Sequence, residues 1–188
     1  MTIRSLAAAA SVIATCLTST ALPCIGGEVM RDQTAPFAVA AVQGTAPNFA
    51  GISTWFNSAP LSMAELRGKV VLVDFWTYGC VNCVNTLPHV TELYAKYKDR
   101  GLVVVGVHTP EFPFERSASN VQAALKRHGI TYPVAQDNGQ QTWNAYRNQY
   151  WPAQYIVDQS GKIVFQHDGE GQYEQIDRII ARLLNASS

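Results

Sequence analysis

Two cysteines three positions apart, Cys80 and Cys83, are the residues whose types and spacing could do the most chemistry in this chain. They lie in the segment WTYGCVNCVNTLP, directly after the apolar run KVVLVDFW. A pair with this spacing can hold a metal ion, carry a haem, form a structural disulfide or exchange a disulfide with another protein. The residues around the pair must distinguish these uses.

Three of the four uses meet a chemical objection. Haem attachment needs a histidine directly after the second cysteine, and Val84 stands there. Zinc needs about four ligands, and although His89 and His108 are available, His89 lies on the expected helix about two turns beyond Cys83. A structural disulfide across so few residues would remove little chain entropy. We therefore expect disulfide exchange, with no metal ion and no other cofactor.

The elements around the pair must place its two sulfurs differently. The run KVVLVDFW is typical of a strand buried on both faces, and residues 80–100 have apolar side chains at helical spacing. Cys80 then lies at a helix start, where free N–H groups and the helix dipole favour a thiolate, the nucleophile of disulfide exchange. Cys83, one turn further on, is expected to be less exposed and to release the partner.

The rest of the chain predicts a single α/β domain with a mixed sheet, parallel strands first and a hairpin last. The segment LVVVGVHT is a second buried strand, so strand, helix and strand form a right-handed βαβ unit. The other expected elements are a strand or hairpin in APNFAGISTWFN, one or two helical turns in SMAELRG closed by Gly68, a helix at 119–128, a strand in YPVAQD, a helical turn in NGQQTWNAYRNQ, the hairpin AQYIVD/KIVFQHD and a closing helix in YEQIDRIIARLL.

Residues 1–21 have the pattern of a secretory signal peptide. A basic start is followed by the apolar run LAAAASVIATCL and a small-residue pattern ending at Ala21. The run is shorter than the roughly 20 residues that span a bilayer. We expect a linker at 22–43, a domain at 44–188 and export to the periplasm or another extracytoplasmic space, with an uncleaved N-terminal anchor as the alternative. The 14 basic and 14 acidic residues balance, so we expect no nucleic acid partner.

The segment VDFWTYGCVNCVNTLP resembles the active-site segment of the thioredoxin superfamily. Within it, residues 44–185 are most similar to exported, TlpA-like proteins, and above all to the thioredoxin-like domain of DipZ-type proteins. The resemblance implies a thioredoxin fold, a central mixed β-sheet flanked by helices, with an N-terminal strand or hairpin extension and a helical insertion. It implies a thiol:disulfide oxidoreductase whose partners are exported proteins with disulfides or dithiols, and a separate membrane electron donor or acceptor.

The resemblance also assigns supporting residues. Asp74, six positions before Cys80, matches a buried acid that relays protons, and a raised pKa would suit an acceptor of the Cys83 proton; the alternative is that Asp74 reaches solvent at the strand end. Pro152 matches a cis-proline in the loop that faces the cysteines. The expected apolar rim for substrate contact consists of Trp151, Pro152, Trp76 and Tyr78.

The chain departs from the family pattern at several positions. Val81 and Asn82 stand between the cysteines where the best-known reductant has Gly-Pro, and Thr86 replaces the acid of ResA-like reductases. The strand LVVVGVHT lacks the lysine that pairs with the buried acid. We favour a reductant over an oxidant.

Two other functions stay open at this point. One is a peroxiredoxin-like thiol peroxidase, because Thr77 stands three positions before Cys80, although Val73 occupies the motif's proline position. The other is a redox-inert or metal-binding module that recruits a partner. Glu111 is expected to be either a solvated loop carboxylate or a group close to the thiols.

Overall fold

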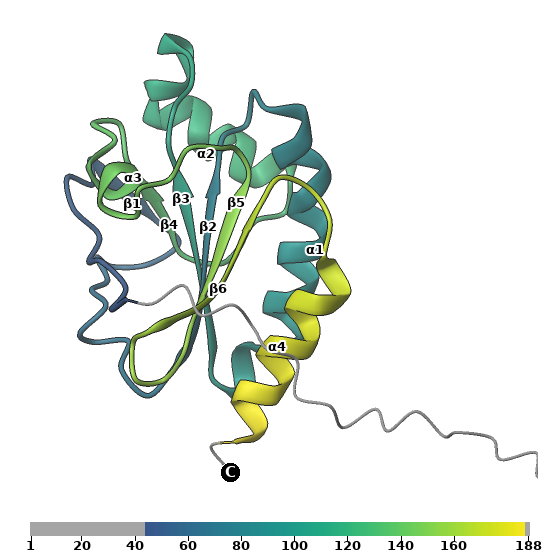
Figure 1. Ribbon diagram of the computed structural model, residues 1–188. Coiled ribbons are helices and arrows are strands. Elements are labelled where there is room, and N and C mark those ends of the chain that lie inside the picture. The colour runs from purple at the N-terminus through teal and green to yellow at the C-terminus, as the bar shows by residue number, and fades with distance from the viewer. Residues whose placement is uncertain (1–43, 187–188) are drawn as a thin grey trace, which may run out of the picture. The chain divides into compact units, whose positions relative to one another are not determined.

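The computed structural model describes residues 44–186, which form one six-stranded mixed sheet with the strand order β1-β4-β3-β2-β5-β6 (Figure 1). The predicted signal peptide at 1–21 and linker at 22–43 lie outside the described residues. Strands β2, β3 and β4 are parallel to one another, whereas β1, β5 and β6 each run antiparallel to their neighbours. The strands are β1 (Thr54–Phe56), β2 (Val70–Trp76), β3 (Leu102–His108), β4 (Val134–Gln136), β5 (Ala153–Val157) and β6 (Ile163–Asp168).

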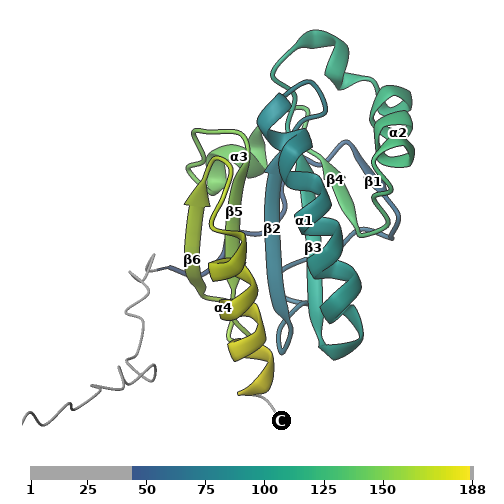
Figure 2. The ribbon, with the colours of Figure 1, turned by 90° about the vertical axis from the view of Figure 1, so that its right-hand side faces the viewer.

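Helices cover both faces of the sheet. Helices α1 (Val81–Tyr97), α2 (Ala118–Arg127) and α4 (Tyr173–Asn185) contribute their apolar side chains to one core cluster, and Figure 2 looks onto the face that α1 and α4 cover. The short helix α3 (Gln141–Ala145) packs on the other face, together with Ala46, Phe49, Met63 and Leu66. Two 3₁₀ turns, η1 (Lys98–Arg100) and η2 (Pro113–Arg116), complete the elements.

Strand β2 is the centre of the fold because every one of its residues is buried. Its side chains alternate between the two faces, so Val71, Val73 and Phe75 enter the core under α3. Leu72 and Trp76 lie on the opposite face, under α1. Asp74, between them in the same alternation, therefore points toward α1.

The predicted elements agree with the structure, except that the first strand is not part of a hairpin. Strand β1 pairs with β4, which lies about 80 positions further along the chain. SMAELRG forms a helical turn as predicted, with Leu66 N–H donating to Ser62 O at 3.2 Å and Arg67 N–H to Ala64 O at 3.4 Å. Gly68 ends this turn at a φ of 81°, a value that glycine adopts without strain.

No helix in the part of the chain that the structure describes has both the length and the apolar character needed to cross a membrane.

Candidate active site

The two cysteines lie where β2 ends and α1 begins, at the end of the sheet that also carries the loop after β3 (Figure 1). Cys80 is the residue that caps α1, and its sulfur accepts a hydrogen bond from the Cys83 N–H at 3.3 Å. Both residues are free thiols. The Cys83 N–H therefore points at the Cys80 sulfur, which lies at the N-terminal end of the helix dipole.

The sulfurs differ in access to solvent. Cys80 is half-buried, whereas Cys83 is completely buried. Burial raises the pKa of the Cys83 thiol far above its ordinary value, and the hydrogen bond with Cys80 raises it further. Cys80 can meet a partner's sulfur, while Cys83 keeps its proton until a nearby base accepts it.

Asp74 is buried behind the pair, with only 1% of its surface exposed, so the alternative in which it reaches solvent at the strand end is wrong. Burial raises the pKa of its carboxyl from 3.8 to about 7, and a hydrogen bond from Gln154 Nε2 to Oδ1 at 3.2 Å partly offsets this effect. The Asp74 charge in turn contributes to the raised pKa of Cys83. The acid and the buried thiol are thus electrostatically coupled.

The partner of Asp74 is an amide because the neighbouring strand has no room for a cation. Gly106 of β3 lies directly opposite Asp74 in the parallel register. A Cβ atom at Gly106 would lie 3.0 Å from Trp76 Nε1 and 3.1 Å from a ring carbon of Tyr132. The two aromatic rings fill the space that a side chain would need, so burial and Gln154 together set the pKa of the acid.

The loop before β5 faces Cys80. The Trp151–Pro152 peptide bond is cis, as the resemblance implies, and the Trp151 carbonyl oxygen lies 3.9 Å from the Cys80 sulfur. Trp151 is half-buried, and its Nε1 donates to Thr109 O at 3.0 Å, which connects this loop to the end of β3. The structure therefore brings Trp151 and Pro152 to the cysteines.

The two other residues of the expected rim occupy different positions. Tyr78 is half-buried and donates its hydroxyl hydrogen bond to Phe114 O at 2.9 Å. Trp76, by contrast, has no exposed surface and belongs to the core under α1. Its expected place in a partner-contacting rim is corrected, because β2 directs its side chain inward.

One carboxylate at the site was missed by the sequence analysis. Glu115 in η2 is completely buried, and its Oε1 accepts the Gly79 N–H at 2.9 Å, next to Cys80. Its Oε2 accepts the N–H groups of Glu111 at 2.7 Å and Phe112 at 2.8 Å. Of the two acids in HTPEFPFE, the exposed Glu111 is the solvated one and Glu115 is the one beside the cysteine loop. The spacing of the pair contains no periodic signal that would have distinguished them.

The histidines considered as metal ligands have other contacts. His89 stacks on Tyr173 with the ring centroids 3.7 Å apart. His108 is buried, burial lowers its pKa to about 4, and its Nε2 lies 3.3 Å from the Thr77 hydroxyl. Within residues 44–186 no three His, Cys, Asp or Glu side chains gather as metal ligands do.

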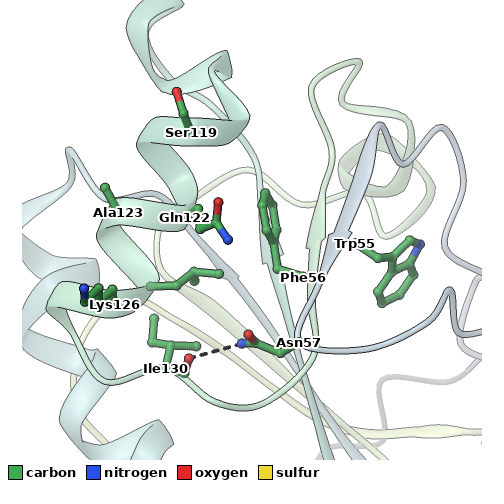
Figure 3. A pocket seen from close by; sticks show the side chains of 9 residues that line it. Trp55, Phe56, Asn57, Ser119, Gln122, Ala123, Lys126 and Ile130 are labelled. Carbon is green, nitrogen blue, oxygen red and sulfur yellow. Dashed lines mark hydrogen bonds between the residues drawn. The ribbon is translucent and has the colours of Figure 1, made fainter.

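A separate pocket of about 670 Å³ lies between β1 and α2 (Figure 3). Asn57 forms part of its lining and donates hydrogen bonds to Ile130 O at 3.1 Å and Tyr132 O at 2.9 Å. None of the residues that line it belongs to the cysteine site. The reactive sulfurs therefore lie outside this pocket.

Comparison with known proteins identifies relatives of this chain. The chain is 48% identical over 145 residues to the Protein DipZ of Mycobacterium tuberculosis, an alignment that covers 76% of this chain but only 21% of DipZ. It therefore spans about a fifth of the DipZ proteins it matches. It is also 30% identical to the thiol-disulfide oxidoreductase ResA of Bacillus anthracis, covering 73% of this chain and 76% of ResA.

A solved structure shows the same fold. The thiol-disulfide isomerase of Corynebacterium glutamicum superposes with a TM-score of 0.67 at 27% identity, over 74% of this chain and 96% of that one. The expected thioredoxin-like fold is thus confirmed. The model of the AhpC/TSA family matches residues 42–166. The chain belongs to the AhpC/TSA family, within the thioredoxin-like superfamily of redox enzymes.

Proposed function

We propose that the protein is an exported thiol:disulfide oxidoreductase that exchanges disulfides with partner proteins through Cys80 and Cys83. The observation that supports this most strongly is the contrast between the sulfurs: an accessible one at a helix start and a fully buried one a turn later. Disulfide exchange needs this contrast, because one sulfur must contact the partner and the other must remain protected until the partner is bound.

In the reductive direction, the Cys80 thiolate attacks one sulfur of a partner's disulfide. A Cys80–partner disulfide forms, the partner's own S–S bond breaks, and its second sulfur leaves as a thiolate that takes a proton from water. Cys83 then loses its proton and attacks the Cys80 sulfur, which forms the 80–83 disulfide and releases the partner's first sulfur as a thiol. The partner gains two electrons and the cysteine pair loses two.

Asp74 is the proposed acceptor of the Cys83 proton. With a pKa of about 7 it is partly ionised near neutral pH, so it can take up a proton there and pass it on. No cation pairs with it in the described residues, and its Oδ2 has no hydrogen-bond partner there. A buried carboxylate without a cation beside it binds a proton more tightly than a carboxylate in water.

The sequence supports the proposed place of the reaction, and the relatives support the proposed class of substrate. The pattern of residues 1–21 supports export, and the names of the relatives support exchange with disulfide-containing proteins. We favour reduction, with exported proteins as partners and a separate membrane protein that supplies the electrons.

A thiol peroxidase receives less support from the site. The Thr77 hydroxyl is fully buried and paired with His108, while the hydrogen bonds of the Cys80 sulfur go to Cys83 and Trp151. A threonine that activated a peroxide would have to face the reactive sulfur instead.

Two assays test the proposal, the reduction of insulin and the reoxidation of reduced ribonuclease. Each is measured with the wild type and with the Cys80→Ser and Cys83→Ser variants. Both variants should lose turnover. Equal activity of the wild type and the Cys80→Ser variant would contradict the exchange function and favour the alternative of a redox-inert module. Equilibration with glutathione then gives the reduction potential of the cysteine pair, and with it the direction of electron transfer. A potential of about −270 mV indicates a reductant and one of about −120 mV an oxidant.

A further inference from the structure

The exposed large hydrophobic side chains of the described residues belong to the three segments that lie next to Cys80. They are Val81 with 69% of its surface exposed, Phe112 with 45%, Phe114 with 57% and Tyr150 with 57%. Val81 directly follows Cys80, and Tyr150 directly precedes the residue whose carbonyl faces the Cys80 sulfur. Large apolar side chains clustered on a surface mark places that a partner covers.

The two phenylalanines lie on a short arm, residues 111–117, between β3 and α2. Their rings stack with centroids 5.6 Å apart and an angle of 3° between the planes. The arm is joined to the cysteine loop at two points: the Tyr78 hydroxyl donates to the Phe114 backbone oxygen at 2.9 Å, and the Gly79 N–H donates to the side-chain Oε1 of Glu115 at 2.9 Å. Figures 1 and 2 show the arm at the same end of the molecule as the start of α1.

The arm reverses the usual preference for apolar side chains inside and charges outside. It buries the Glu115 carboxylate completely while it leaves Phe112 and Phe114 in solvent. Burying a carboxylate is costly, and three backbone N–H groups compensate it here. The Glu115 contacts thus hold the arm in a conformation that keeps both rings at the surface beside Cys80.

We propose that the arm is a docking surface for an extended polypeptide segment that has a large apolar side chain within a few residues of its disulfide. This proposal rests on the disulfide exchange proposed above. In the mixed disulfide the partner's sulfur lies about 2 Å from the Cys80 sulfur, so the partner's chain must cover the surface next to it. The exposed residues that flank Cys80, namely Gly79, Val81 and Asn82, carry no charge. The largest exposed side chains of the arm are the two phenylalanines, so the proposed recognition is by apolar contact.

Two disulfide peptides of equal length test the proposal, one with Phe and Leu beside its cystine and one with Ser at those positions. The second-order rate constant of their reduction is measured with the full chain. The wild type should reduce the apolar peptide about tenfold faster, since burying even part of two aromatic rings is worth that factor. The Phe112→Ser/Phe114→Ser variant should bring this ratio close to one.

Two matched variants separate apolar contact from disturbance of the arm. Phe112→Leu/Phe114→Leu keeps the apolar surface and should keep most of the wild-type ratio. Arg116→Ser changes an exposed residue of the same arm without removing apolar surface and should also keep it.

Equal wild-type rates on the two peptides, or an unchanged ratio in the Ser variant, would overturn the docking surface. A wild-type dimer in sedimentation that the Ser variant abolishes would overturn it too, by assigning the surface to a second copy. A wild type that reduces neither peptide nor a small disulfide such as cystine would instead overturn the exchange function itself.

Discussion

Replacing Asp74 with asparagine should remove a pH dependence that the buried carboxyl imposes on folding. The pKa of Asp74 is about 7 in the folded chain and near 3.8 in the unfolded one. Between these values the folded state binds the Asp74 proton more tightly than the unfolded state does. The contribution of Asp74 to stability is therefore largest below about pH 4 and falls as the pH rises to about 7. At about 1.4 kcal/mol per pKa unit, the loss amounts to about 4 kcal/mol.

Urea unfolding of the dithiol form at several values between pH 4 and pH 8 measures this loss. Asparagine keeps the shape of the side chain and can still accept the hydrogen bond from Gln154. The free energy of unfolding of the variant relative to the wild type should therefore increase by about 4 kcal/mol across the range, because the other titrating groups cancel in the difference. Two curves that stay parallel from pH 4 to pH 8 would refute the buried, protonated Asp74.

Three further measurements test the site, one with the same Asp74 substitution and two with new substitutions. In stopped-flow measurements, the wild-type release of a mixed disulfide by Cys83 should speed up as the pH rises through about 7, and Asp74→Asn should slow it by about 100-fold at pH 7.5; an equal rate would exclude Asp74 as proton acceptor. Glu115→Gln should cost about 2 kcal/mol in urea unfolding and speed the hydrogen exchange of the amides that bond to Glu115, since one acceptor oxygen becomes a donor; unchanged exchange would contradict the role of Glu115 in holding the arm. Gly106→Ala should lower stability by about 2 kcal/mol in thermal unfolding, because the new Cβ would meet the Trp76 indole at 3.0 Å; a neutral effect would mean that the neighbouring rings yield easily.

Much of the fold could be predicted because its central elements carry strong local patterns. The continuous apolar runs of β2 and β3 and the helical spacing between them are properties of neighbouring residues, so they determined the βαβ unit. The pairing of β1 with β4 could not be predicted in the same way, because it joins Trp55 to Ala135, 80 positions away.

In the candidate site, too, the local patterns could be predicted and the contacts between distant residues could not. The positions of Cys80 and Cys83 followed from their spacing and from the strand and helix on either side. The contacts of Gln154 with Asp74 and of Glu115 with Gly79 join residues 80 and 36 positions apart, and nothing in the local sequence marks either of them. Such contacts depend on how β5 and the arm pack against the centre of the fold.

Trapping the mixed disulfide tests the division of roles between the two cysteines most directly. The Cys83→Ser variant, mixed with a peptide disulfide and analysed by mass spectrometry after acid quenching, should accumulate one covalent adduct whose linkage maps to Cys80. The Cys80→Ser variant should accumulate almost no adduct at Cys83, because the Cys83 sulfur is completely buried. Equal yields of the Cys80 adduct in one variant and the Cys83 adduct in the other, or neither adduct, would contradict the proposed roles of the two cysteines.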